Sequence, residues 1–324
     1  MYWKEKMKRL IYDNLTNRMT EEVVLEDEVI DKAIQENIFF DTEEFHELHE
    51  KNAEKLIKIY FKNGKKINSF IYIGIRNDIG YVPYSSPFSN LHTKLNFRAE
   101  EIKTIVNNLK NIIQELKLKE LNISFPPCIY DSSIEEKISI FLSEGFRIKY
   151  IDVNNYFNLS EEIIQDRAVK KDFNNNIKNN LKFEENDLEI AYQVIKKNRE
   201  ARGFPLKMTL DHIKNIEKLK NAKVDTFYVT YNEIPIASAI VFEVLPLKKQ
   251  VIYWGNDTEF HEIKPMAFLV NKLLEYYKNE GIKILDIGPS SELGRINYGL
   301  LQFKKNIGCK SCLKYTLRYE NTNI

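Results

Sequence analysis

Cysteine is scarce in this chain, with only Cys128, Cys309 and Cys312 among 324 residues. Three thiols cannot build a framework of disulfides of the kind that stabilises small extracellular domains. We therefore expect the protein to work in the reducing cytoplasm. Cys309 and Cys312 have the spacing of half a zinc site, but Cys128 is the only other thiol, so we expect no metal site.

Long apolar runs are absent too. No stretch reaches the roughly 18 apolar residues that a membrane-spanning helix needs, and no apolar signal core follows the charged first residues. The net charge is only +1, so no overall field attracts DNA or an anionic membrane. Hydrophobic residues make up 43% and charged residues 29%, which is ordinary for a globular chain that is long enough for two cores.

One succession of predicted elements occurs twice. Residues 56–75 read as a β-hairpin that turns at Asn63-Gly64, and residues 224–244 read as a second hairpin that turns at Asn232-Glu233. A short helix precedes each hairpin. A third strand, a long helix, a strand, a second helix ending at glycine and a last strand follow it. A duplication of this length predicts two domains of one fold, and the groove between them is the first place to look for a ligand.

The composition along the chain suggests four segments. Residues 160–207 are polar and mostly helical in pattern, and they are expected to bridge the repeats. The N-terminal segment is charged, with a weak helical pattern at 26–37. The predicted segments are an N-terminal extension (1–38), a first domain (39–159), the helical bridge (160–207) and a second domain (208–324).

The element order predicts an α/β fold of the α+β type, with a mixed, mainly antiparallel sheet in each domain and helices flanking it. Apolar residues at helical spacing predict the first long helix at 98–118. Pro265 suits the first turn of its counterpart and Gly281 its end. The last strand, 312–319, alternates Leu and Tyr with Lys, Thr and Arg, which predicts one buried and one solvated face.

This element order resembles that of the GNAT N-acyltransferase superfamily. Residues 141–147 resemble the superfamily's ending of an aromatic, polar residues and Gly-Phe, and residues 303–308 are their counterpart. The tandem arrangement is similar to the Fem-type peptidoglycan-bridge aminoacyltransferases, over roughly residues 39–320. The resemblance implies acyl-CoA or aminoacyl-tRNA as the acyl donor. The stretches most specific to it are 198–205, 285–291 and 297–304.

The chain departs from the superfamily pattern in two places. GNAT acetyltransferases cradle the pyrophosphate of acyl-CoA on a glycine-rich turn before the long helix, whereas the matching turn, 257–265, contains no glycine. Fem-type enzymes share this loss, although their coiled-coil arm is absent here because no heptads are sustained. Lys304 stands where the superfamily often has a tyrosine acid. We therefore expect weak or absent acetyl-CoA binding at the helix N-terminus and Lys264, and a donor that makes most of its contacts near Arg199 and Arg202.

The catalytic candidates lie at and after the end of the predicted strand 282–287, because ligands of open sheets bind beyond the carboxyl ends of strands. Asp286, Ser290 and Tyr298 are the catalytic candidates, with Tyr298 as the proton donor. Lys264 is the candidate for binding the donor cofactor. The substrate-binding candidates are Asn198, Arg199, Arg202, Tyr253, Trp254, Asn256, Ser291 and Asn297.

Each candidate also has a purely structural interpretation. Asp286 can cap the turn that follows it, and the serines can cap the next helix. The aromatic candidates can belong to the core, and the arginines can lie on an exposed helical face.

Two further patterns carry weaker signals. His46 and His49 have the i,i+3 spacing of metal ligands, but we expect a solvated helical face there. A group of lysines interleaved with acidic residues can form a tRNA-facing patch, although a solvated bridge is the simpler interpretation. These lysines are Lys170, Lys171, Lys178, Lys182, Lys196 and Lys197.

Together these features predict an acyltransferase that joins an acyl or aminoacyl group to an amine of a cell-envelope or sugar-type acceptor. A positioned base, or a phosphate of the acceptor, would take the amine proton, and Tyr298 or backbone donors would stabilise the oxyanion. Acetyl-CoA or another acyl-CoA, or aminoacyl-tRNA, is the expected donor, with no metal. The alternative is a non-catalytic binding protein that has lost donor binding.

Overall fold

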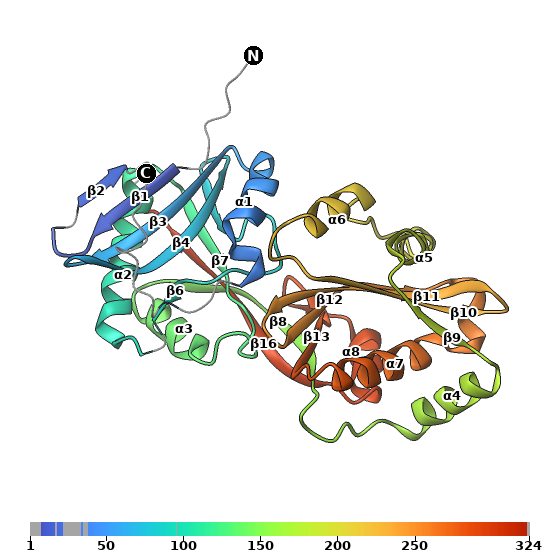
Figure 1. The fold of residues 1–324 in the computed structure, drawn as a ribbon. Coiled ribbons are helices and arrows are strands. Elements are labelled where there is room, and N and C mark those ends of the chain that lie inside the picture. The colour runs from blue at the N-terminus through green and yellow to red at the C-terminus, as the bar shows by residue number, and fades with distance from the viewer. Residues whose placement is uncertain (1–7, 17, 22–33, 35–37, 95, 323–324) are drawn as a thin grey trace, which may run out of the picture. The chain divides into compact units, whose positions relative to one another are not determined.

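The computed structural model describes residues 8–16, 18–21, 34, 38–94 and 96–322 (Figure 1). The chain forms two compact units, Met1–Ile151 with Leu313–Ile324, and Asp152–Cys312. The division falls inside two strands, β8 (Arg147–Asn158) and β16 (Lys310–Glu320). Within the described residues, no helix is both long and apolar enough to cross a membrane.

The first unit is built on a mixed sheet in the order β2-β1-β3-β4-β5-β7-β16. Neighbouring strands are antiparallel, except that β1 pairs with β3 and β5 pairs with β7 in parallel. Its strands are β1 (Lys8–Asp13), β2 (Arg18–Glu21), β3 (Lys55–Asn63), β4 (Lys66–Arg76), β5 (Ile79–Val82), β7 (Glu120–Ser124) and the short β6 (His92–Thr93) beside β4. Its helices are α1 (Glu43–His49), α2 (Ala99–Glu115) and α3 (Ile134–Ser143).

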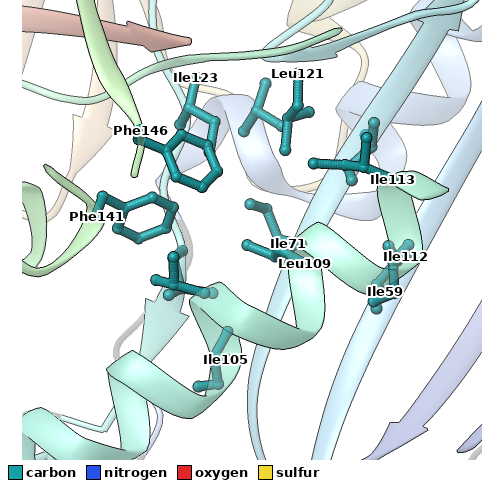
Figure 2. Close-up of a cluster of buried hydrophobic side chains, with 14 of the residues drawn as sticks. Ile59, Ile71, Ile105, Leu109, Ile112, Ile113, Leu121, Ile123, Phe141 and Phe146 are labelled. Atoms are coloured by element: carbon teal, nitrogen blue, oxygen red, sulfur yellow. The ribbon is translucent and has the colours of Figure 1, made fainter. Parts of the chain in front are cut away.

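The predicted helix at 98–118 is confirmed as α2, and its apolar residues build the core of the first unit. Buried residues recur along it at intervals of three and four, so one face of the helix lies against the sheet. Figure 2 shows these side chains meeting those of the central strands and of the segment that ends α3. The labelled residues are Ile59, Ile71, Ile105, Leu109, Ile112, Ile113, Leu121, Ile123, Phe141 and Phe146.

The second unit repeats this plan with the sheet order β8-β13-β12-β11-β10-β9. β12 and β13 are parallel, and the other pairs are antiparallel. Figure 1 shows α5 and α6 on one face of this sheet and α7 on the other. Its strands are β9 (Lys182–Glu185), β10 (Val224–Tyr231), β11 (Ile234–Leu245), β12 (Lys248–Asn256) and β13 (Ile284–Pro289), and its helices are α4 (Arg167–Lys178), α5 (Leu188–Ala201), α6 (Leu210–Glu217), α7 (Pro265–Asn279) and α8 (Tyr298–Asn306).

Both predicted hairpins are confirmed, as β3–β4 and β10–β11. Asn232 and Glu233 both adopt positive φ, 49° and 64°, as a two-residue turn between twisted strands requires. Pro265 begins α7, and Gly281, with φ of 71°, follows its end. Two units with one element order, each a mixed sheet flanked by helices, match the predicted fold class.

The structure differs from the sequence expectations at both ends of the chain. The N-terminal segment adds β1 and β2 to the first sheet, and the helix expected at 26–37 lies outside the described residues apart from Ile34. β16 does not alternate as predicted, because Leu313 is 46% exposed and Thr316 is buried. Thr316 faces inward because its hydroxyl bonds with that of Ser124 on β7, at 2.8 Å.

The segment expected to bridge the two repeats belongs to the second unit. β9, which the sequence pattern did not predict, pairs with β10, and α5 packs on β11. The hydroxyl of Ser238 on β11 donates to the carbonyl of Ala191 on α5, at 2.7 Å. The compact units therefore do not follow the proposed boundaries at 160–207 or at the last strand.

Candidate functional site

The ladder between the two parallel strands of the second unit ends early. β12 and β13 pair only over Lys248–Gln250 and Ile284–Asp286. β12 then continues to Asn256 beside β11, whereas β13 stays paired with β8, as far as Pro289 opposite Asn154. No other strand in the described part of the chain pairs with the edge of β12 that faces β13. The sheet therefore opens at the carboxyl ends of two parallel strands, where open sheets bind ligands.

The matching pair of strands in the first unit stays closed. β5 pairs with β7 along its whole length, Ile79–Val82 against Glu120–Ile123. The chain then turns back, and the backbone N–H of Ser89 donates to the carbonyl of Ser124 at the end of β7, 3.0 Å away. The first unit thus occupies the end of its parallel pair with its own chain. We therefore place the candidate site in the second unit.

Asp286 is the last residue of β13 that pairs with β12, and it is fully buried. Its carboxylate accepts hydrogen bonds from the side-chain amides of Asn154 on β8 and Gln250 on β12, at 2.8 and 2.9 Å. It also accepts from the backbone N–H of Gly288, at 2.8 Å. Asp286 therefore ties three strands together at the point where the sheet opens, and it caps the following turn as its structural interpretation predicted.

The two serines after β13 are buried and bonded to β8. The hydroxyl of Ser290 donates to the side chain of Asn155, and its N–H donates to the carbonyl of Val153. The hydroxyl of Ser291 donates to Asp152 and accepts from the N–H of Val153, at 2.7 and 2.8 Å. Their structural interpretation as caps of the next helix is wrong. That cap is the Asn297 side chain, which accepts from the N–H of Leu300.

Tyr298, by contrast, is 77% exposed at the start of α8. It follows a tight hairpin formed by β14 (Ser291–Glu292) and β15 (Arg295–Ile296). Ile296 lies in β15 and is 40% exposed. Ser290, Asn297 and Tyr298 are linked through the chain, because the N–H of Asn297 donates to the carbonyl of Ser290 at 2.8 Å. Of the three catalytic candidates, only Tyr298 is open to a substrate.

The helix end that carries the arginine candidates lies beside β12. Asn198 is buried and donates to the carbonyl of Asn256 at 2.6 Å. The guanidinium of Arg199 lies 5.9 Å from the ring centre of Tyr253, and its Nε is buried without an acceptor. Within the described residues, no carboxylate forms an ion pair with Arg199, whereas Arg202 is exposed at the end of α5. Arg199 is therefore available to an anion.

Tyr253 and Trp254 lie on opposite faces of β12, and both are partly exposed. The Tyr253 hydroxyl accepts from the N–H of Met208 at 3.2 Å, and burial raises its pKa. Trp254 packs edge-on against Phe303 of α8, with ring centres 6.2 Å apart. Since these residues follow Gln250, both faces of the unpaired stretch of β12 carry an aromatic side chain.

The glycine-free turn before α7 folds as a 3-10 helix, Thr258–Ile263, followed by Lys264 with φ of 56°. Asp257 caps the turn, and its carboxylate forms an ion pair with Lys197 at 2.7 Å. Lys264 is exposed and precedes Pro265, the first residue of α7. The positive end of the α7 dipole and one lysine therefore stand where β12 ends.

Sequence reasoning missed three residues of this site. Gln250 and Asn154 bind Asp286 from other strands. Lys304, noted only as a departure from a tyrosine, is 1% exposed and donates to three backbone carbonyls of β13. No local signal marks the first two, but a lysine on the apolar face of an amphipathic helix was a readable sign of burial.

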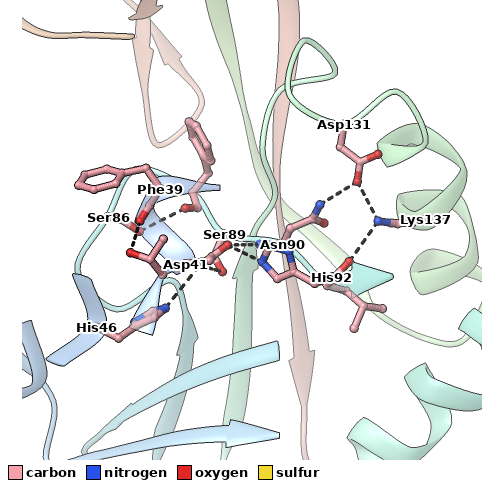
Figure 3. Close-up of polar contacts among 12 residues, drawn as sticks. Phe39, Asp41, His46, Ser86, Ser89, Asn90, His92, Asp131 and Lys137 are labelled. Carbon is pink, nitrogen blue, oxygen red and sulfur yellow. Dashed lines mark hydrogen bonds and ion pairs between the residues drawn. The ribbon is translucent and has the colours of Figure 1, made fainter. Parts of the chain in front are cut away.

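The first unit holds a second polar cluster, which is buried (Figure 3). The Asp41 carboxylate accepts from the hydroxyl of Ser89 at 2.6 Å and lies 2.9 Å from Nε2 of His92. Asn90 joins this group to the buried ion pair of Asp131 and Lys137, because its backbone N–H donates to Asp41 and its side-chain amide donates to Asp131. The cluster links the segment after β5 to α3.

The expectation that His46 lies on a solvated face is wrong. His46 is 2% exposed, stacks on Tyr72 with ring centres 3.8 Å apart, and lies 3.6 Å from Asp41. Burial lowers the pKa of His46, although Asp41 acts against this. Burial alone would raise the pKa of Asp41, but its interactions with His46 and His92 prevail and hold it at about 2. Asp41 therefore stays charged while His46 titrates.

This cluster predicts a loss of stability in mild acid. Because the folded-state pKa of His46 is depressed, the unfolded chain takes up the proton first as the pH falls below 6.5. Between pH 7 and pH 5, His46→Phe should remove up to about 2 kcal/mol of the pH-dependent loss in unfolding free energy. Denaturant unfolding of both proteins at the two pH values measures this. His49→Phe is the control, and an unchanged pH dependence in His46→Phe would contradict the assignment.

Within the described ranges, no three His, Cys, Asp or Glu side chains gather where they could hold a metal ion. Of the interleaved lysines, Lys182, Lys196 and Lys197 form ion pairs with neighbouring carboxylates.

No protein-family model matches the chain, and no curated protein matches it in sequence. Among solved structures it is similar to FemX, with a TM-score of 0.62 and 13% identity, covering 87% of this chain and 92% of that one. It is also similar to L-PGS from Bacillus licheniformis, with a TM-score of 0.57 and 11% identity over 89% and 94% of the two chains. A third similar structure is a conserved protein of unknown function from Bacteroides thetaiotaomicron. Its TM-score is 0.54 and its sequence identity 10%, over 78% of this chain and 83% of that one. The likeness shows that this chain shares the fold of these solved chains over most of its length, as the fold prediction expected.

Proposed function

We propose that the protein is an acyltransferase that moves an acyl or aminoacyl group onto an amine of a cell-envelope or sugar-type acceptor. The observation that carries this proposal is the early end of the ladder between β12 and β13. Unpaired N–H groups on the edge of β12 can bind the oxygen of an acyl carbonyl, because strand amides there have no ladder partner. The acceptor class rests on the sequence resemblance to the Fem-type enzymes.

The donor lies with its carbonyl in this opening and its phosphate groups near the N-terminus of α7. Lys264 and the first amides of α7 supply positive charge at that point. With no glycine and a 3-10 turn before Lys264, the backbone does not form a cradle for a pyrophosphate. This favours aminoacyl-tRNA, whose contacts lie mostly elsewhere, over acetyl-CoA.

The acceptor approaches from the face of β12 that carries Tyr253. Arg199, which has no carboxylate partner there, binds a phosphate or carboxylate of the acceptor, and Arg202 lies three residues further along the helix. The amine attacks the acyl carbonyl, a C–N bond forms, and the C–O bond of an ester or the C–S bond of a thioester breaks. Tyr298 gives a proton to the leaving oxygen or sulfur, while a base or an acceptor phosphate takes the amine proton.

Donor binding tests this proposal. Thermal unfolding with acetyl-CoA, CoA, charged tRNA and uncharged tRNA should show a rise in melting temperature with charged tRNA, and little or none with CoA. Arg199→Ala should weaken binding of an anionic acceptor without affecting donor binding. Lys264→Ala should weaken donor binding, whereas Lys278→Ala, at the far end of α7, should not.

Two outcomes would overturn parts of the proposal. If none of the donors shifts the melting temperature, the alternative of a binding protein that has lost its donor site is the better one. Tight acetyl-CoA binding that is lost in Lys264→Ala and kept in Arg202→Ala would instead indicate an ordinary CoA-dependent acetyltransferase.

A further inference from the structure

Lys304 is a buried cation at the end of β13. Its ammonium donates to the backbone carbonyls of Ile287, Gly288 and Pro289, at 2.9, 2.8 and 3.0 Å. These are the three residues directly after Asp286, where pairing with β12 stops. An ammonium has three protons to donate, so all of them are used.

The backbone of these residues does not suit a continued ladder. Gly288 has φ of 72°, which is not an extended conformation, and Pro289 has no N–H to donate. Ile287 and Gly288 are buried, and a buried carbonyl group needs a hydrogen-bond donor. Lys304 supplies all three donors at once.

The helix that carries Lys304 touches both separated strands. Phe303 packs against Trp254, which lies on the stretch of β12 beyond the last paired residue. The next residue, Lys304, binds the end of β13. α8 therefore holds the two strands from one face through consecutive side chains.

We propose that Lys304 is a positioning residue that keeps β12 and β13 apart, by binding the carbonyls of residues 287–289 and fixing that segment away from β12. Its meaning for acyl transfer rests on the function proposed above. On this account Lys304 does not act on the substrate as the acid that the superfamily has at this position.

The charge of Lys304 makes this role dependent on pH. Burial lowers the pKa of Lys304 to about 8, while the charges of Asp286 and Cys309 act in the opposite direction. A neutral amine has only two protons to donate, so above pH 8 one of the three carbonyls loses its donor. The segment after Asp286 should then loosen.

Amide hydrogen exchange on the full chain tests the proposal without any donor. In Lys304→Met, protection of the amides of residues 287–291 should fall at least about tenfold, while that of β10 and β11 is kept. Lys305→Met, which changes the exposed neighbour on α8, should leave both unchanged. Unchanged protection of 287–291 in a folded Lys304→Met would overturn the proposal.

A pH series keeps the test decisive if Lys304→Met does not fold. Between pH 7 and pH 9.5, wild-type protection of 287–291, corrected for the intrinsic exchange rate, should drop around pH 8 and that of β10 should not. Lys304→Arg, which stays charged, should lack this drop. Protection that does not change with pH would overturn the proposal.

Binding of charged tRNA separates this inference from the proposed function. If protection of residues 287–291 falls in Lys304→Met but the wild type binds no donor, the role of Lys304 is supported and the proposed acyltransferase function is rejected. If the wild type binds a donor but protection is unchanged in Lys304→Met, the proposed function is supported and the role of Lys304 is rejected.

Discussion

Asp286→Ala is expected to lower the unfolding free energy of the second unit by about 3–5 kcal/mol. The substitution leaves three buried donors without an acceptor: the amides of Asn154 and Gln250 and the N–H of Gly288. Each unmet donor costs about 1–3 kcal/mol, and the cavity adds to this. Urea unfolding, followed by hydrogen exchange within residues 152–312, measures the loss.

Asp286→Asn is the matched variant because it keeps the shape. The single oxygen of the new amide still accepts, but its NH₂ group faces a donor that the carboxylate had satisfied. We therefore expect a smaller loss of unfolding free energy than in Asp286→Ala. A loss below about 1 kcal/mol in Asp286→Ala would mean that the carboxylate is not a structural tie. The interpretation of Asp286 as a catalytic residue would then be favoured.

Lys137→Met is expected to destabilise the first unit by about 3–5 kcal/mol. Lys137 is fully buried, lies 2.8 Å from Asp131 and donates to the carbonyl of Leu91 at 3.1 Å. Without it the Asp131 carboxylate stays buried with no cation, which is the costly half of a broken ion pair. Denaturant unfolding at neutral pH measures the change.

The double variant Asp131→Asn with Lys137→Met provides the control. Asparagine removes the unpaired charge, so the double variant should be more stable than Lys137→Met alone. If both unfold alike, the cost comes from lost packing around Lys137, and the ion pair is not its source.

Local sequence signals predicted most of the fold. Asn232-Glu233 marks a hairpin because its backbone must adopt positive φ, and Pro265 and Gly281 mark the ends of a helix through properties of single residues. β9 escaped prediction because its four residues are polar or partly exposed and gain order from pairing with β10. The sequence of β16 alternates, yet Thr316 is buried, where its hydroxyl forms a hydrogen bond with that of Ser124, 192 residues away in the sequence.

The candidate site was predictable only in part. The end of a central strand located Asp286, but its partners Asn154 and Gln250 come from strands 132 and 36 residues away in the sequence. Their meeting depends on strand order and register, which a local pattern does not contain. Tyr298 was identified from its place after the loop, and its exposure follows from the hairpin before it. His46 was misread because its burial comes from Tyr72 and Asp41, on other elements.

The position of β16 in the sequence affects the order in which the two units can fold during synthesis. Residues 313–320 belong to the first unit, where residues 316–320 pair with β7 and Leu317 is fully buried. The second unit, Asp152–Cys312, is continuous and holds its own core. During synthesis, the first unit must therefore wait for residues 313–320, which follow the whole second unit in the sequence, so the second unit is the first able to fold. A ribosome that stops before residue 313 releases a protein with one finished half and one open sheet edge at β7.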